Sequence, residues 1–143
     1  MSLHDRTLID KAVFAKARRE LGSSFIRIFG YFEEDGRKSV DAIEAAMRAK
    51  NAAALVMPAH TLKGEAHQFG ADELGLVAEQ IEKIARSCVE TRDVPDEALE
   101  LVVGLRKLFV ATLSILQSEA NPLVERRPGG LGRRSALGVN NAW

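Results

Sequence analysis

Apolar residues recur at helical spacing along almost the whole chain, and this pattern restricts the possible folds more than any other feature of the sequence. Stretches that alternate apolar and polar residues between turn residues, the usual sign of strands, are nearly absent. Gly, Pro and Asn interrupt the pattern, which divides it into five predicted helices at about residues 5–21, 24–47, 52–69, 72–91 and 95–118. Their short connections favour an up-and-down helical bundle.

Residues with known preferences for helix ends set these boundaries. Gly22 suits the end of the first helix, and Asn51 suits the N-cap of the third. Pro95 suits the first turn of the last helix. Gly36 lies inside the second helix, where it permits a bend. On the last helix we expect one buried face, made of Leu99, Val102, Val103, Leu105, Leu108, Phe109, Leu113 and Leu116.

The composition changes near the C-terminal end. Residues 122–143 hold four of the 11 Gly, two of the four Pro and four Arg, with little apolar periodicity, which is typical of a flexible tail. We therefore predict a helical domain at residues 1–121 and a Gly/Arg-rich tail at 122–143. The net charge of zero is a cancellation, because the tail carries four Arg and one Glu, or +3, and the rest of the chain −3.

Composition also argues against several classes of function. Equal numbers of basic and acidic residues, 20 of each, argue against a nucleic-acid-binding protein. The single Cys rules out an intramolecular disulfide framework and a Cys-rich metal site. No apolar run approaches the roughly 20 residues that cross a bilayer, and the N-terminus lacks the apolar segment of a signal peptide. We therefore expect a cytoplasmic protein that has no membrane contact.

The predicted helix at residues 52–69 has two different faces. At about 100° per residue, one side carries an apolar stripe of Leu55, Ala59, Leu62, Ala66 and Phe69. His60 lies on the opposite side together with Lys63, Gly64 and His67. His60 is therefore expected to be at least partly exposed, unlike a core histidine.

Gly64 and Pro58 are unusual residues for the interior of this helix. Gly64 costs roughly 1 kcal/mol relative to Ala, but beside an exposed His it leaves a flat spot where the backbone of another protein could approach. The alternative, tight packing of Gly64 against a neighbouring helix, is disfavoured because the apolar stripe is elsewhere. Pro58 either only kinks the helix axis or also changes where His60 points.

A metal site is not expected among the three His residues and the single Cys. His67 follows His60 by seven residues, or about 10.5 Å along a helix axis, whereas two helical ligands of one metal prefer a spacing of four residues. His4 lies near the N-terminus. We therefore predict no bound metal.

Glu82 lies at the edge of the apolar stripe of the predicted helix at residues 72–91, next to Ala78 and Ala85. It therefore borders the helix that carries His60. A carboxylate in this place could accept a hydrogen bond from a ring N–H of His60 and fix the tautomer and orientation of the imidazole. The alternative is an ordinary solvated Glu.

The block Ala59-His60-Thr61-Leu62-Lys63-Gly64, followed by Gly70-Ala71 and Leu74, resembles the histidine-containing phosphotransfer (Hpt) domains of bacterial and plant phosphorelays. The resemblance covers about Leu8 to Leu116 and includes Leu21-Gly22, Phe25, Phe32, Ala45-Ala46 and Ile81-Glu82. It implies an all-α fold, an up-and-down four-helix bundle with an additional N-terminal helix. Glu65 departs from the family, which commonly has a small residue there, and Pro58 is not part of the general pattern.

The resemblance also implies a role for each residue of the block. His60 is then the phosphoacceptor, Lys63 the cation that stabilises the phosphoryl group, and Glu82 the group that orients the imidazole. A receiver domain is expected to contact the surface residues Gly64, Glu65, His67 and Gln68.

A member of this family is a phosphocarrier that relays a phosphoryl group between its histidine and the aspartate of response-regulator receiver domains. The resemblance thus implies two partners, a receiver domain and an upstream sensor or hybrid histidine kinase. We expect a monomer with no kinase or phosphatase activity and no cofactor of its own, because the receiver supplies Mg²⁺.

Three alternatives remain open at this stage. The chain could be the phosphoacceptor module of a chemotaxis-type kinase, although its 143 residues include no ATP-binding segment. It could be a non-relaying Hpt-like adaptor that binds a receiver or a kinase. It could also be a structural helical protein in which the His-Lys-Gly block is a coincidence. Acid-labile, base-stable phosphate on His60 after incubation with a phosphorylated receiver would separate these alternatives.

Overall fold

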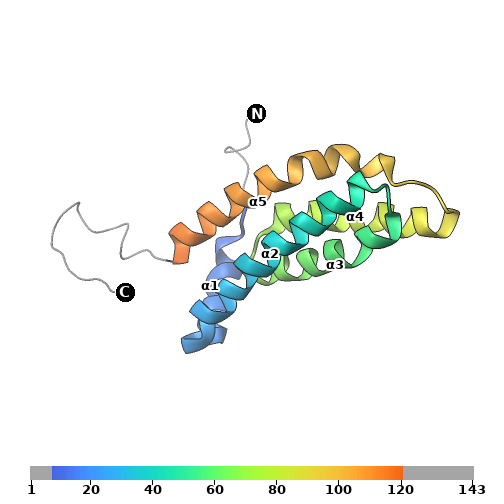
Figure 1. Ribbon diagram of the computed structural model, residues 1–143. Coiled ribbons are helices and arrows are strands. Elements are labelled where there is room, and N and C mark those ends of the chain that lie inside the picture. Colours follow the sequence, from blue (N-terminus) through green and yellow to red (C-terminus); the bar gives the residue numbers. More distant parts are fainter. Residues whose placement is uncertain (1–7, 121–143) are drawn as a thin grey trace. The chain divides into compact units, whose positions relative to one another are not determined.

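The computed structural model describes residues 8–120, and its regular elements are all helical (Figure 1). The α-helices are α1 (Lys11–Leu21), α2 (Phe25–Arg48), α3 (Ala52–Gln68), α4 (Asp72–Thr91) and α5 (Leu99–Ala120), with 3-10 turns at Gly22–Ser24 and Asp96–Ala98. The chain divides into two units at residues 1–113 and 114–143, and the packing and the site described below belong to the first. The predicted tail at 122–143, and the domain boundary before it, lie outside the described residues.

Helices α2 to α5 form the predicted up-and-down four-helix bundle, and α1 is the additional N-terminal helix. Helix α3 packs against both α2 and α4. None of the helices within residues 8–120 combines the length and the apolar character that crossing a membrane requires.

Helix α1 begins later than the sequence predicts. Asp10 is extended and caps the helix, because its Oδ1 accepts hydrogen bonds from the backbone N–H groups of Ala12 (3.0 Å) and Val13 (3.2 Å). The N–H of Asp10 donates to the carbonyl of Gly70 at 2.7 Å. The predicted helix from residue 5 is therefore wrong at residues 8–10, which are not helical, and its residues 5–7 lie outside the described part.

The other predicted helix ends are close to the observed ones. Asn51 caps α3 through a hydrogen bond from the N–H of Ala54 to its Oδ1 (3.1 Å). Gly70 follows α3 with a φ of 78°, and a Cβ there would lie 2.5 Å from the carbonyl oxygen of Asp10. Glycine therefore suits this turn both because of its backbone conformation and because the segment before α1 passes so close.

The core is organised around a single cluster of aromatic rings. All six Phe residues of the chain belong to it, with ring centroids of neighbouring pairs 5.3–6.3 Å apart. Each ring is at most 6% exposed, and the members are Phe14, Phe25, Phe29, Phe32, Phe69 and Phe109. The cluster joins α1, α2, α5 and the end of α3, so it anchors the N-terminal helix to the bundle that carries the site.

Gly36 has a role in packing that the sequence did not indicate, and two residues of α5 differ from the prediction. Gly36 is a contact point, because a Cβ there would lie 2.5 Å from the Cε1 atom of Phe109 on α5. On α5 itself, Leu99 (52% exposed) and Val103 (74%) face solvent and were wrongly assigned to the core. They fall outside the arc of Val102 and Leu105 that faces the bundle, and an apolar side chain is no proof of burial.

Candidate functional site

His60 lies on the solvent-facing side of α3, as the helical wheel predicts. The residues of the opposite stripe, Leu55, Ala59, Leu62 and Ala66, have no exposed surface, whereas 49% of the His60 side chain is exposed. Helix α3 continues unbroken through Pro58. The imidazole is therefore accessible to a large partner while its backbone belongs to a fully packed helix.

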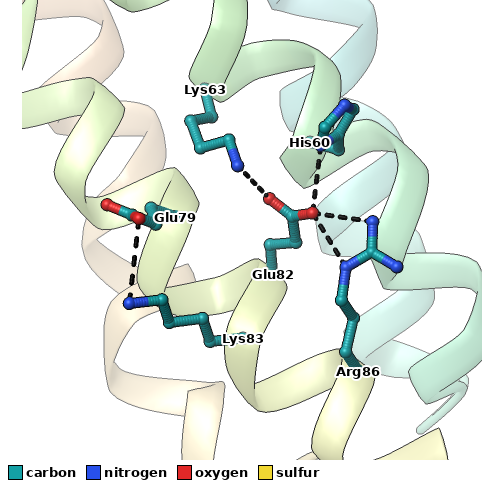
Figure 2. Close-up of polar contacts among 6 residues, drawn as sticks. All are labelled: His60, Lys63, Glu79, Glu82, Lys83 and Arg86. Atoms are coloured by element: carbon teal, nitrogen blue, oxygen red, sulfur yellow. Dashed lines mark hydrogen bonds and ion pairs between the residues drawn. The ribbon is translucent and has the colours of Figure 1, made fainter.

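Glu82 on α4 lies directly beside His60 and is buried, with 5% of the residue exposed. The Nδ1 atom of His60 lies 3.0 Å from Oε2 of Glu82, and Nζ of Lys63 lies 2.8 Å from Oε1. Arg86 approaches Oε2 with its Nε (2.9 Å) and one Nη (2.8 Å). Figure 2 shows the three donors converging on this carboxylate from α3 and α4. Glu82 is thus not the solvated residue that the sequence left as an alternative.

The three donors keep Glu82 ionised. Burial alone would raise the pKa of its carboxyl group, but the hydrogen bonds from Lys63, Arg86 and His60 outweigh burial and bring this pKa to about 2. A carboxylate can only accept hydrogen bonds, so Nδ1 of His60 must carry the proton of the neutral ring. The lone pair of the neutral ring is then on Nε2, the atom that can attack an electrophile.

The surface around His60 contains an open glycine. Apart from its chain neighbours and the adjoining backbone of α3, no atom lies within 4 Å of the position that a Cβ of Gly64 would occupy, so packing against other elements does not require glycine there. This excludes tight intramolecular packing as the reason for Gly64. Gln68 is exposed. His67 is 45% exposed, with Nδ1 3.6 Å from Asp72 and its ring against Gly75, where a Cβ would lie 2.5 Å from Cε1.

Glu65 differs from the other residues predicted to contact a receiver. It is partly buried and shares a hydrogen bond with Asp35 of α2, a neighbour that the sequence did not identify. Burial, the negative charge of Asp35 and this hydrogen bond together raise the pKa of Glu65 to about 7. At neutral pH Glu65 therefore carries only part of a negative charge.

Comparison with known proteins identifies the chain. Among protein-family models, that of the Hpt domain matches residues 27–118, a span that includes His60, Lys63, Glu82 and Arg86. The chain belongs to the Hpt domain family. Hpt domains are phosphocarrier modules of two-component phosphorelays, and they generally interact with response-regulator receivers and kinases.

The fold is also similar to a solved structure, that of histidine-containing phosphotransfer protein B from Pseudomonas aeruginosa. The TM-score is 0.69 at 23% sequence identity, and the match covers 80% of this chain and 96% of the other. A search of the curated proteins found no match. The structural likeness supports the helical-bundle fold of this Hpt domain.

Arg86 of this Hpt domain is a partner of Glu82 that the sequence did not indicate. One turn after Glu82 on α4, it has the spacing of four residues at which an acidic and a basic side chain meet on a helix. That spacing was a usable signal, but it is common on exposed helices and does not show that Glu82 is buried against α3. Within residues 8–120, no group of three or more His, Cys, Asp and Glu side chains could hold a metal ion.

Proposed function

We propose that this Hpt domain is a histidine phosphocarrier that accepts a phosphoryl group on Nε2 of His60 and passes it to the aspartate of a response-regulator receiver domain. The observation that carries the proposal is the pairing of an exposed imidazole with a buried, ionised carboxylate at Nδ1. This pairing leaves Nε2 as the nucleophilic atom and directs it away from the carboxylate. The open surface at Gly64 gives a partner room to approach.

The transfer step needs little chemistry from the protein. Nε2 of neutral His60 attacks the phosphorus of the aspartyl phosphate, so a P–N bond forms, the P–O bond to the aspartate breaks, and the aspartate leaves as a carboxylate. The ring keeps its proton on Nδ1, which stays hydrogen-bonded to Glu82 and so fixes the orientation of the attacking Nε2. The reverse transfer follows the same path, because phosphohistidine and aspartyl phosphate are both high-energy species. Positioning and charge stabilisation are the main contributions to such reactions.

Lys63 is proposed to stabilise the phosphoryl group once it is on His60. In the unphosphorylated protein its ammonium group pairs with Oε1 of Glu82, and 27% of the side chain is exposed. Because Lys63 follows His60 by about one turn of α3, a modest movement would bring the ammonium group to a phosphoryl oxygen. The receiver would hold the Mg²⁺ that neutralises the transferring group.

The partners in this proposal are a receiver domain and an upstream sensor or hybrid histidine kinase. We place the receiver on the exposed face of α3, where Gly64, His67 and Gln68 follow His60 along the helix, with Glu65 at its α2 edge. We infer that the protein works in the cytoplasm as a monomer and has no kinase or phosphatase activity of its own.

The decisive experiment is phosphorylation of the wild-type protein and of His60→Gln. A panel of phosphorylated receiver domains, and phosphoramidate as a partner-free donor, would be offered to each protein. The wild type should gain acid-labile, base-stable phosphate on the peptide that contains His60, and His60→Gln should gain none. With phosphoramidate as the donor, His67→Gln is the matched control, because it removes a similarly exposed imidazole from the same helix but keeps the acceptor, and no receiver has to dock.

Two results would contradict the proposal. Undiminished labelling of His60→Gln would show that another residue is the acceptor. Binding of a receiver without any labelling of the wild type, by receiver or by phosphoramidate, would instead indicate the non-relaying adaptor.

A further inference from the structure

Arg86 and His60 bind the same oxygen atom of Glu82. Oε2 lies 3.0 Å from Nδ1 of His60, 2.9 Å from Nε of Arg86 and 2.8 Å from an Nη of Arg86. Lys63 lies against the other oxygen, Oε1, at 2.8 Å. The guanidinium group therefore contacts the carboxylate at the atom that holds the imidazole (Figure 2).

The balance of charge at this point decides which form of His60 is present. A buried carboxylate with an imidazole as its only partner favours the imidazolium ion, because an opposite charge stabilises the protonated ring. In the imidazolium ion Nε2 also carries a proton and cannot attack phosphorus. Lys63 and Arg86 together bring two positive charges to the single negative charge of Glu82, which leaves a net charge of +1 beside the ring. Arg86 thus offsets the negative charge of Glu82 at the oxygen atom that faces Nδ1 of His60.

We propose that Arg86 is a positioning residue for phosphoryl transfer. It binds Oε2 of Glu82 through its Nε and Nη atoms, which holds the carboxylate against Nδ1 and keeps His60 in the neutral form with a nucleophilic Nε2. This inference rests on the proposed function, in which His60 is the phosphoacceptor. The planar fork of arginine suits the role, because two donors on one rigid group fix a carboxylate more firmly than a single ammonium group does.

The other charged groups nearby do not compete for this carboxylate. Lys83 pairs with Glu79 at 3.7 Å on the same helix, and both lie apart from Glu82 in Figure 2. From α3, the charged group that reaches Glu82 is Lys63, and it does so at Oε1. Arg86 is thus the cation placed to set the charge at Oε2.

A purely structural role for Arg86 would have different consequences. Its side chain is 56% exposed and pairs with a residue one turn away, and such ion pairs contribute little to stability because water screens them. Substitutions at position 86 should therefore leave the protein folded. Lys83→Met offers a matched control, since Lys83 is also a cation on α4 with an acidic partner four residues before it.

The test compares Arg86→Met, Lys83→Met and the wild type by two measurements. The first follows protonation of the His60 ring by its NMR chemical shifts as the pH changes. The second is the rate at which phosphoramidate phosphorylates His60 between pH 5 and pH 9. In Arg86→Met the ring titration and the acid limb of the rate profile should both move upward by about 0.5 pH unit. This shift is smaller than the shift that a directly adjacent charge would cause, because water screens the exposed guanidinium group. Lys83→Met should move neither.

The rates at two pH values separate positioning from direct contact with the donor. An upward shift of about 0.5 pH unit makes Arg86→Met up to about threefold slower than the wild type at the acid end of the profile, pH 5, and leaves the two proteins equal at pH 9. A loss of equal size at both values would show that Arg86 binds the phosphoryl donor itself and would overturn the proposal. An unchanged ring titration would overturn it as well.

Two further variants test the route through Glu82. Arg86→Lys keeps the charge but loses the fork, so its shift should be smaller than that of Arg86→Met. In a Glu82→Gln background, Arg86→Met should shift the titration by less than half as much, and an undiminished shift would contradict action through the carboxylate. The NMR titration needs no phosphate, so it tests the role of Arg86 even if the wild type accepts no phosphoryl group. A wild type that accepts no phosphoryl group would count against the proposed function and not against the role of Arg86.

Discussion

Replacing Glu82 by Gln should lower the free energy of unfolding at neutral pH and have a smaller effect in acid. The carboxyl group of Glu82 has a pKa of about 2 in the folded protein, compared with 4.5 for an unperturbed glutamate, because Lys63, Arg86 and His60 stabilise its charge despite burial. A group whose pKa is depressed by folding stabilises the folded state above its unfolded pKa. That contribution disappears as the pH falls from about 4.5 through 2.

The size of the effect follows from these two pKa values. A difference of about 2.5 units at 1.36 kcal/mol each sets a ceiling of roughly 3 kcal/mol at pH 7. Water reaches the partners of Glu82, since the exposed fractions of Lys63, His60 and Arg86 are 27%, 49% and 56%. Screening therefore reduces the expected value to about 1–2 kcal/mol. More than half of it should be lost by pH 3, which is well below the unfolded pKa.

Urea denaturation of both proteins at pH 7, 5, 4 and 3 measures this contribution. The quantity to compare is the difference in free energy of unfolding between wild type and Glu82→Gln at each pH, because the other carboxyl groups contribute to both proteins. Glu79→Gln is the matched control: Glu79 is also on α4 but pairs with the exposed Lys83, so its loss should cost no more than about 0.5 kcal/mol. A wild-type advantage of the same size at pH 7 and pH 3 would refute the assignment of a strongly stabilised carboxylate.

Two other substitutions test the packing and the second carboxyl group. Gly36→Ala should destabilise the protein by about 1–2 kcal/mol in urea denaturation, because its methyl group would overlap the buried Phe109 ring. Gly30 has open space around it, so Gly30→Ala should stabilise the protein by up to about 1 kcal/mol. Equal effects of the two would contradict the packing argument. Glu65→Gln should raise the free energy of unfolding by about 1 kcal/mol at pH 8 and by nearly nothing at pH 4. Burial and Asp35 raise the pKa of the Glu65 carboxyl group to about 7, because they destabilise its ionised form in the folded protein. Glutamine removes this cost, which is nearly absent at pH 4. A stability gain that persists at pH 4 would contradict this origin.

Most of the helical framework could be predicted because it depends on local interactions. The repeat of apolar residues every three or four positions determines which stretches are helical, and cap residues such as Asn51 act on backbone groups within a few positions. The start of α1 was missed for a non-local reason. The backbone of Asp10 pairs with Gly70, which lies sixty residues further along the chain, and this contact holds residues 8–10 out of the helix.

In the candidate site, too, the features that depend on one helix could be predicted, and those that depend on packing between helices could not. His60, Lys63 and Gly64 lie on one helix, so their shared face and the exposure of His60 followed from the helical repeat alone. Glu82 was placed correctly at the edge of α4, but its burial was not predictable. Arg86 was missed because its contact with Glu82 matters only when α4 is packed against α3.

By itself, the sequence determined the helices, the exposed face of α3 and the family, since these depend on residue type and on spacings of a few positions. Only the tertiary structure decided the electrostatics of the site. The rotation and register of α4 relative to α3 bring the Glu82 carboxylate within 3.0 Å of His60 and leave it shared with two cations. In the same way, the packing of α2 beside α3 joins Asp35 to Glu65. Charges interact according to distance and burial, and for residues on different helices both quantities are set by packing.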